Sequence, residues 1–262
     1  MSALLRFEFR KLFKNKTFYV CLAISIGLLI LNTIISKVSA DLMKEFAEEM
    51  GESYIYEFSA LSLLKTPLVT TMGLSNTVAV QVIALSIIVC EDFVGDIIKN
   101  VYSKGYSRTQ VYFAKLISSF VAFFLILLGG MIISFVLGIA LTGELGSVGK
   151  NYVGSLFCIL LLAVAFFIVY YSICIIFKKV ASSIVLGILG PAGLVIILTL
   201  LNLLIKNEDI TLNDYWIYGA MNNLAAESVD NKAIIISIVV SIVTIIGFGC
   251  LSFFLNNKKD VK

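Results

Sequence analysis

The sequence has no histidine, and only 14% of its 262 residues are Asp, Glu, Lys or Arg. Without histidine there can be no His-ligated zinc or haem site and no Ser-His-Asp triad, so most enzymes that activate water are excluded. A soluble domain of this length carries about a quarter charged residues. Here 60% of the residues are hydrophobic and the mean hydropathy is +1.01, so the sequence predicts a protein embedded in lipid.

Other sites are poorly supported as well. The five cysteines all fall inside apolar runs, at no metal-ligand spacing, so we interpret them as small core residues. A formal net charge of +3 is too small to indicate a nucleic-acid partner. We therefore expect no catalytic residue, no bound metal and no cofactor in this chain.

Six apolar runs are each long enough to cross a bilayer as a helix, and none contains a charged residue. They are Phe18 to Ser36, Leu68 to Cys90, Leu116 to Leu141, Tyr152 to Phe177, Ala181 to Leu204 and Ala233 to Leu255. The second run is interrupted by polar residues and is expected to face protein rather than lipid. A Val38-Ser39-Ala40 sequence resembles a signal-peptidase site, but the preceding run is longer than a usual signal segment. The prediction is a polytopic all-α membrane protein with six transmembrane helices in one domain, residues 1–262.

The distribution of Lys and Arg predicts the orientation of these helices. With both termini in the cytoplasm, 14 of the 20 basic residues lie on the cytoplasmic side, whereas 12 of the 17 acidic residues lie outside. Cytoplasmic loops retain basic residues, so this is the expected arrangement. Residues 37–67 and 205–232 are then extracellular loops. In the first, Leu42, Met43, Phe46, Ala47 and Met50 predict a short amphipathic helix.

Residues 1–17 have an amphipathic pattern. Leu5, Phe9 and Leu12 repeat at helical spacing on one face, and basic residues repeat every four positions on another. The pattern predicts a basic helix lying on the inner leaflet, although a simple cluster of topogenic charges would have the same sequence.

The loop at 91–115 carries the most detailed pattern in the chain. Its apolar residues form a helical stripe consisting of Phe93, Val94, Ile97, Ile98, Val101 and Tyr102, with Asp96 beside it. Gly105 suits a helix end. Ser107 and Gln110 then form a capping box, and Tyr106 with Val111 forms a hydrophobic staple, so a new helix is expected to begin beside Arg108.

The acidic pair after the second run, the Ile-Ile-Lys-Asn stretch and the sequence Gly-Tyr-Ser-Arg-Thr-Gln-Val-Tyr-Phe-Ala-Lys resemble the type 2 ABC transporter permeases. The resemblance implies that residues 91–115 hold a coupling helix that docks on an ATPase, through Phe93, Val94, Asp96, Ile97, Ile98, Val101, Tyr102 and Arg108. It also implies a pair of six-helix permeases on a dimer of ATP-binding subunits in the bacterial cytoplasmic membrane. Short helices re-entering the membrane are expected in the last outer loop.

The chain has no phosphate-binding loop of its own, because the nearest sequence, Gly146 to Lys150, lacks the required spacing and hydroxyl. ATP and Mg are therefore expected in a separate subunit. A candidate translocation path follows Thr70, Thr77, Gln81 and Pro191 on the second and fifth spans. Pro191 would be either a gating hinge or a static bend. Peptides or other amphipathic molecules are the expected cargo.

Two other classes compete with this hypothesis. A secondary transporter or channel that works without an ATPase usually carries charges inside its spans, and the predicted spans have none. A non-transporting membrane partner would not need a cytoplasmic docking helix. Copurification of an ATPase would separate these classes.

Overall fold

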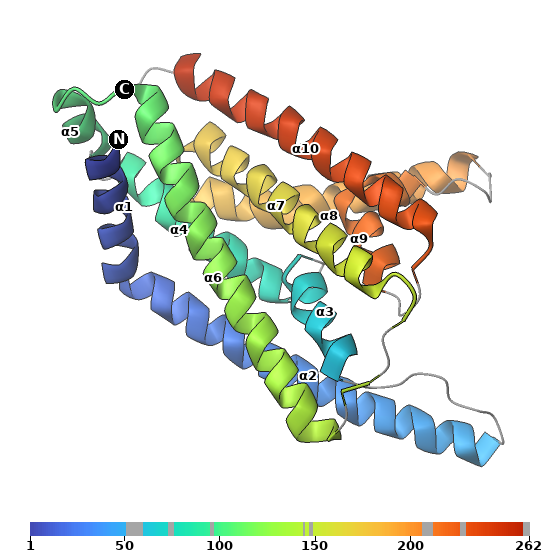
Figure 1. The fold of residues 1–262 in the computed structure, drawn as a ribbon. Helices are drawn as coiled ribbons and strands as arrows, with labels where there is room; N and C mark the ends of the chain where they lie inside the picture. The colour runs from blue at the N-terminus through green and yellow to red at the C-terminus, as the bar shows by residue number, and fades with distance from the viewer. Residues whose placement is uncertain are drawn as a thin grey trace.

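The computed structural model describes residues 1–50, 60–72, 76–94, 97–143, 145–146, 149–205, 212–225 and 229–258. Within these residues the chain is helical and has no strand. The elements are α1 (Ser2–Lys14), α2 (Lys16–Met50), α3 (Ala60–Met72), α4 (Asn76–Val94), α5 (Ile97–Ser103), α6 (Arg108–Thr142), α7 (Tyr152–Phe177), α8 (Val180–Ile205), η1 (Leu212–Tyr215), α9 (Ile217–Ala225) and α10 (Asn231–Lys258). The all-α prediction is confirmed for the described residues (Figure 1).

Among the described residues, five helices are long and apolar enough to cross a membrane, namely α2, α6, α7, α8 and α10. A sixth crossing requires α4 and α5 to be counted together, although their axes differ by 53°. The helices indicate a multi-pass membrane protein. They confirm five of the predicted spans by length and composition, and the bent pair of α4 and α5 is the sixth candidate.

The second predicted span differs most from the structure. It was expected as one helix from Leu68 to Cys90, but α3 ends at Met72 and α4 begins at Asn76. Threonine, serine, glycine and asparagine are frequent between residues 70 and 77, and these residues favour helix ends over helix interiors. A prediction based on apolar length alone did not detect the division between α3 and α4.

The described parts of the first predicted outer segment are helical. Residues 37–50 continue α2 as one helix of 35 residues, about 52 Å long at 1.5 Å per residue. The predicted short amphipathic helix is thus the projecting end of α2, which lies beyond the other helices in Figure 1 and exposes Met43, Phe46 and Met50. Residues 60–67, placed in the same loop, belong to α3.

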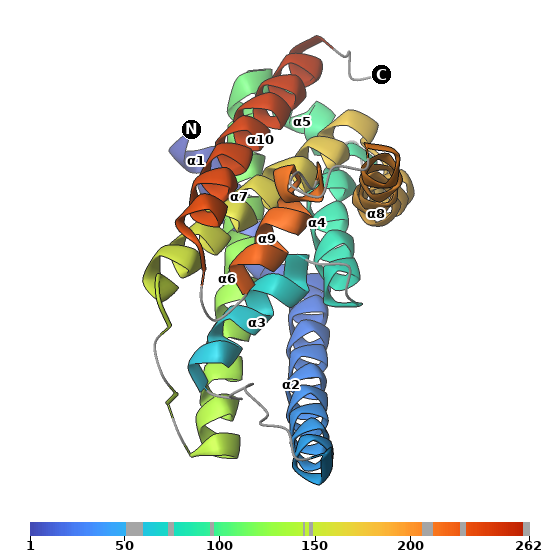
Figure 2. The same ribbon diagram turned by 90° about the vertical axis from the view of Figure 1, so that its right-hand side faces the viewer.

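Helix α7 lies at the centre of the bundle. It packs closely against α10 and also contacts α3, α4, α6, α8 and α9 (Figure 2). Its largest buried side chains include Phe167 and Tyr171, whose rings meet those of α6. The main apolar core therefore surrounds α7, whereas α8 lies at the edge of the bundle beside α4 (Figure 2).

Small residues allow α3 and α6 to cross closely. Gly130, Ser134 and Gly138 follow one another every four residues on α6, and all three are buried. A Cβ added at Gly138 would lie 2.8 Å from the Cα of Ala60. These small residues thus form a packing surface, and its partner is α3.

The segment between α8 and α10 folds back into the bundle. Tyr218, at the start of α9, meets Phe166 near the middle of α7 with ring centroids 5.4 Å apart. At the other end of α9, the Leu224 carbonyl accepts a hydrogen bond from Lys65 of α3, at 3.3 Å. The corner is tight, because a Cβ at Gly219 would lie 1.9 Å from the carbonyl oxygen of Asn213. The segment contains two short helices, η1 and α9, and α9 buries one face against the long helices.

Candidate functional site: the charged end of the bundle

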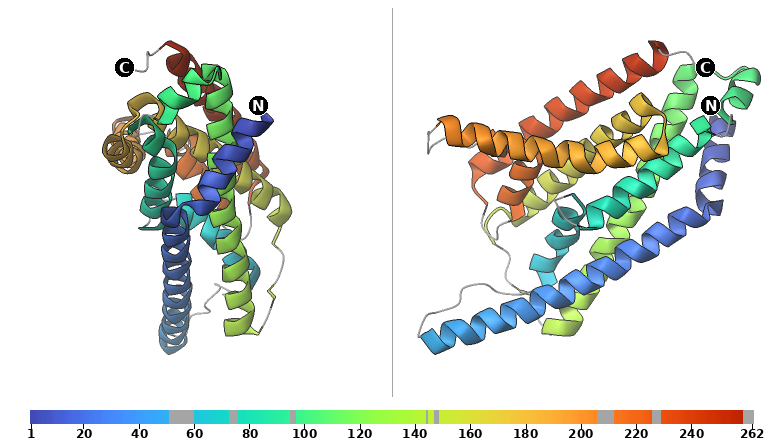
Figure 3. Two further views of the ribbon diagram at one scale, coloured as in Figure 1. Left: turned by 90° about the vertical axis from the view of Figure 1, so that its left-hand side faces the viewer. Right: turned by 180° about the vertical axis from the view of Figure 1, so that it is seen from behind.

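One end of the bundle gathers the start of α1, all of α5, the start of α6 and the last turn of α10 (Figures 1 and 3). Helix α1 lies across this end, at an angle to the long helices (Figure 1). Asn15 joins α1 to α2, since its Oδ1 accepts a hydrogen bond from the backbone N–H of Thr17 at 2.9 Å. Arg108 joins α6 to α10 by donating to the carbonyl of Asn257 at 3.2 Å.

The turn between α5 and α6 follows the sequence pattern closely. Gly105 has a φ of +86°, a conformation that glycine adopts without strain, and its N–H donates to the carbonyl of Tyr102 at 2.9 Å. The Ser107 hydroxyl accepts from the N–H of Gln110 at 3.3 Å, and the Gln110 carboxamide accepts from the N–H of Ser107 at 3.1 Å. The predicted capping box is therefore confirmed.

The apolar stripe of α5 faces its own chain. Val101 and Tyr102 pack with Leu4 of α1 and with Val111 and Ala114 of α6, and Tyr106 joins the same cluster, as the predicted staple requires. Burial raises the pKa of the Tyr102 hydroxyl. Helix α5 is thus held against α1 and α6.

The other docking residues are arranged as follows. Ile98 is 2% exposed and Ile97 is half-buried. The exposed side chains of α5 and the following turn are polar or basic: Lys99, Asn100, Ser103 and Lys104. Asp96 and the side chain of Val94 lie outside the described residues. The surface that α5 presents outward is therefore polar, whereas the sequence stripe suggested an apolar one.

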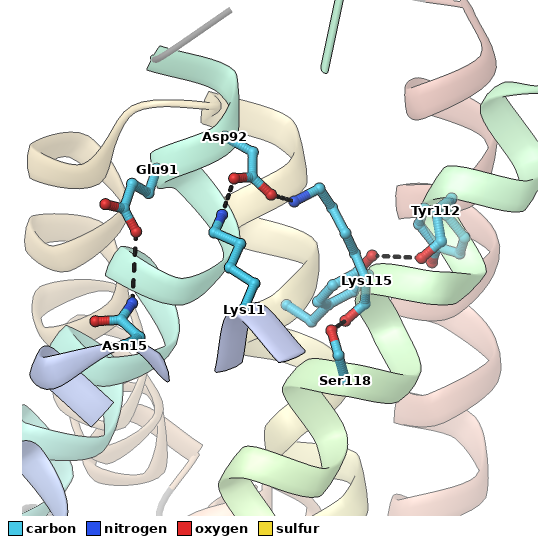
Figure 4. Close-up of polar contacts among 8 residues, drawn as sticks. Lys11, Asn15, Glu91, Asp92, Tyr112, Lys115 and Ser118 are labelled. Atoms are coloured by element: carbon cyan, nitrogen blue, oxygen red, sulfur yellow. Dashed lines mark hydrogen bonds and ion pairs between the residues drawn. The ribbon is translucent and has the colours of Figure 1, made fainter. Parts of the chain in front are cut away.

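A buried carboxylate links three helices behind α5. Asp92, at the end of α4, is 1% exposed and forms ion pairs with Lys11 of α1 and Lys115 of α6 (Figure 4). Next to it, Glu91 accepts a 3.5 Å hydrogen bond from Asn15 (Figure 4). We call Lys11, Asp92 and Lys115 the charge hub.

The charge hub has a surplus of positive charge, because one carboxylate faces two ammonium groups. Burial and the nearby Lys115 lower the pKa of Lys11, whereas the charges of Glu8 and Glu91 act in the opposite direction. Glu8 is itself 7% exposed, on the packed face of α1. Phe93 adds a ring face, with Lys115 and Lys178 5.7 and 5.4 Å from its centroid. The hub can thus hold α1, α4 and α6 together electrostatically.

The candidate path residues are distributed over three helices, α3, α4 and α8. Gln81 on α4 is 1% exposed, and within the described chain neither atom of its carboxamide has a hydrogen-bond partner. Pro191 is buried on α8, which continues unbroken through it. Helices α4 and α8 touch where Val82 meets Gly187, since a Cβ at Gly187 would lie 2.5 Å from Val82 Cγ1. Thr70 lies in α3 and Thr77 in α4, and their side chains are outside the described set.

Sequence reasoning missed the charge hub and the attachment of α8. Asp92 and Lys115 each lie next to an apolar run and Lys11 lies in the basic N-terminal segment, but nothing in the sequence shows that the two lysines reach the same carboxylate. The sequence feature that could have indicated how α8 is attached is the four-residue spacing of Ser183, Gly187 and Pro191. These residues form the buried stripe of α8.

Among the described residues, no group of three His, Cys, Asp or Glu side chains could hold a metal ion. A scan against protein-family models finds no matching family, and searches of curated proteins and of solved structures find no similar chain. The functional argument therefore depends on the geometry of this end of the bundle.

Proposed function

We propose that this chain is the membrane-spanning permease subunit of an ATP-driven ABC exporter in the bacterial cytoplasmic membrane. A separate ATP-binding subunit, present as a dimer, would bind ATP and Mg, and a second or related permease copy would complete the translocation path. The cargo would be a peptide or another amphipathic molecule. Both termini and α5 would then lie in the cytoplasm, in agreement with the distribution of basic residues.

The observation that carries the proposal is the mounting of α5. A helix of seven residues at the end of α4, bent by 53° from it, is held by apolar contacts to α1 and α6. The charge hub clamps the end of α4 to the same two helices. A push on α5 would therefore move α1, α4 and α6 together, which is what coupling to a nucleotide-driven partner requires.

We infer that the partner meets a face of α5 other than the apolar stripe. Val101 and Tyr102 are occupied by contacts within the chain, so the docking surface would be the polar face with Asn100, Ser103 and Lys104. The exposed Lys99 and Lys104 give α5 and the following turn positive charge, which fits an acidic groove on an ATPase.

The test is affinity purification of the full chain from its native membrane, with identification of partners and an ATPase assay. We expect an ATPase to copurify with the native chain and to be lost with Asn100→Glu/Lys104→Glu. The matched control is Lys44→Glu, an exposed lysine on the projecting end of α2, which should retain the ATPase. A native preparation without ATPase would overturn the proposal.

The coupling role of the charge hub needs its own variant. Asp92→Asn should leave the ATPase bound but abolish stimulation of its activity by cargo, because α4 is no longer clamped to α1. Glu91→Gln, one residue away and exposed, should keep normal stimulation. Equal behaviour of the two variants would show that the charge hub has no part in coupling.

One observation favours a secondary transporter as the second candidate. Asp92 and Lys115 are 1% and 2% exposed at the ends of two long helices, and buried charge pairs of this kind occur in proton- or ion-coupled carriers. In that case transport into vesicles would follow an imposed ion gradient without ATP.

A further inference from the structure

A groove runs along the outer face of α10. Its volume is about 460 Å³. One wall is α10 itself, and the other is the corner between η1 and α9. The lining residues are Tyr215, Trp216, Val239, Val240, Val243, Thr244, Gly247, Phe248 and Leu251.

The groove lies at the depth of the membrane interior. The residues from Val239 to Leu251 fall within the apolar run of α10. Trp216 immediately precedes α9, and its carbonyl accepts a hydrogen bond from the N–H of Ala220 at 2.9 Å. Tyr218, two residues further on, meets Phe166 near the middle of α7. Val239 is 55% and Val243 65% exposed, so the groove opens toward lipid rather than into the bundle.

The dimensions of the groove fit a lipid acyl chain. From Val239 to Leu251 it extends about 18 Å along α10, which is about the hydrocarbon depth of one leaflet. A volume of about 460 Å³ over that length accommodates a single polymethylene chain lying along the helix. Because the groove opens toward lipid, the acyl chains of the bilayer are the molecules that lie beside it.

The lining has the chemistry for such a chain. Aliphatic and aromatic side chains dominate it, and Gly247 leaves open space, since an added Cβ there would meet nothing within 4 Å. We propose that this groove binds one acyl chain of a bilayer lipid, packed against Trp216. The inference requires only that α10 lies in a membrane, so it does not depend on the proposed transport function.

The chain contains a single tryptophan, Trp216, which provides a native reporter in the groove. The purified full chain in detergent micelles is titrated with phosphatidylcholine brominated in the middle of its acyl chains, because bromine quenches indole fluorescence on contact. The expected result is a saturable loss of Trp216 fluorescence that unbrominated phosphatidylcholine reverses by competition.

Two glycine variants make the test specific. Gly247→Phe fills the groove without a clash at its Cβ and should abolish the saturable quenching. Gly193→Phe, at an equally open position on α8, should leave it unchanged. If Gly247→Phe does not fold, Val243→Phe on the same wall replaces it.

Three results would overturn the proposal. Quenching that increases in proportion to lipid without saturation would indicate general contact with micelle lipid. Quenching that persists in the filled variant would place the lipid elsewhere. Fluorescence that depends on protein concentration but not on brominated lipid would indicate that a second copy covers Trp216.

Discussion

Helices α7 and α8 have the same length and almost the same hydropathy, but they occupy opposite kinds of environment. Each has 26 residues, and their most apolar windows have mean hydropathies of 2.8 and 2.6. Yet 67% of the α7 window is buried inside the protein, against 11% for α8. Apolar character predicts that a helix crosses the membrane, but it does not predict where the helix lies within the bundle.

The physical reason is that lipid chains are as apolar as leucine, so the hydrophobic effect does not drive these helices together. Close packing and hydrogen bonds between helices determine the arrangement instead. Ser172 of α7 donates to the Phe248 carbonyl of α10 at 3.0 Å, and Tyr171 donates to the Tyr112 carbonyl of α6 at 2.9 Å. Helix α8, in contrast, is attached mainly along its stripe of Ser183, Gly187 and Pro191.

The largest expected difference between the two helices comes from truncating one large side chain in each. Phe167→Ala removes a fully buried ring from α7 and should lower the free energy of unfolding by about 3 kcal/mol. Leu189→Ala, at a side chain 64% exposed on α8, should change it by less than about 0.5 kcal/mol. Thermal unfolding of both variants in the same detergent measures the contrast. Equal losses would mean that α8 is as well packed as α7.

A smaller effect on the free energy of unfolding is expected from placing a larger side chain in the buried stripe of α8. Gly187→Leu would force α8 away from Val82 and Tyr170 and should cost about 1–3 kcal/mol. Gly193→Leu, which meets nothing within 4 Å, should be close to neutral. A cysteine pair placed across α4 and α8 would report the separation by its rate of disulfide formation. If crosslinking in the Gly187→Leu background were as fast as in the native chain, the stripe would not hold α8.

The smallest expected effect concerns one hydrogen bond. Tyr171→Phe removes the bond to the Tyr112 carbonyl and should cost about 0.6–1 kcal/mol, the usual value for such bonds in membranes. Helix α8 contains no tyrosine, so the exposed counterpart is Tyr19 of α2, whose hydroxyl donates to the Phe13 carbonyl at 3.0 Å. Tyr19→Phe should have no measurable effect on chemical denaturation. A larger loss of stability for Tyr19→Phe on α2 than for Tyr171→Phe on α7 would contradict the assignment of α7 as a well-packed helix.

Local sequence patterns predicted several features of the fold. Apolar length identified five of the long helices, and the Ser-x-x-Gln pattern identified the start of α6 because the two capping hydrogen bonds involve residues only three apart. The packing surface through Gly138 is also a local pattern, since small residues at four-residue spacing lie on one face of any helix. Features that depend on neighbouring residues in the chain were thus accessible.

Features that depend on distant residues were not. The pairing of Lys11 with Asp92 joins positions 81 residues apart, and no local pattern encodes that distance. The division between α3 and α4 was missed because average hydropathy hides a cluster of residues that favour helix ends. For α5, the apolar stripe was correctly identified as helical, but periodicity does not show whether the stripe packs on its own chain or on a partner.

The charge hub also imposes an order on biosynthesis. Lys11 emerges from the ribosome long before Asp92, and Asp92 emerges before Lys115, so α1 has no partner for its buried face until α4 and the start of α6 have been made. The bond from Arg108 to Asn257 can form only when the last helix is complete. The contact between α6 and α10 at the end of the bundle that bears α5 therefore forms only after α10 has been made.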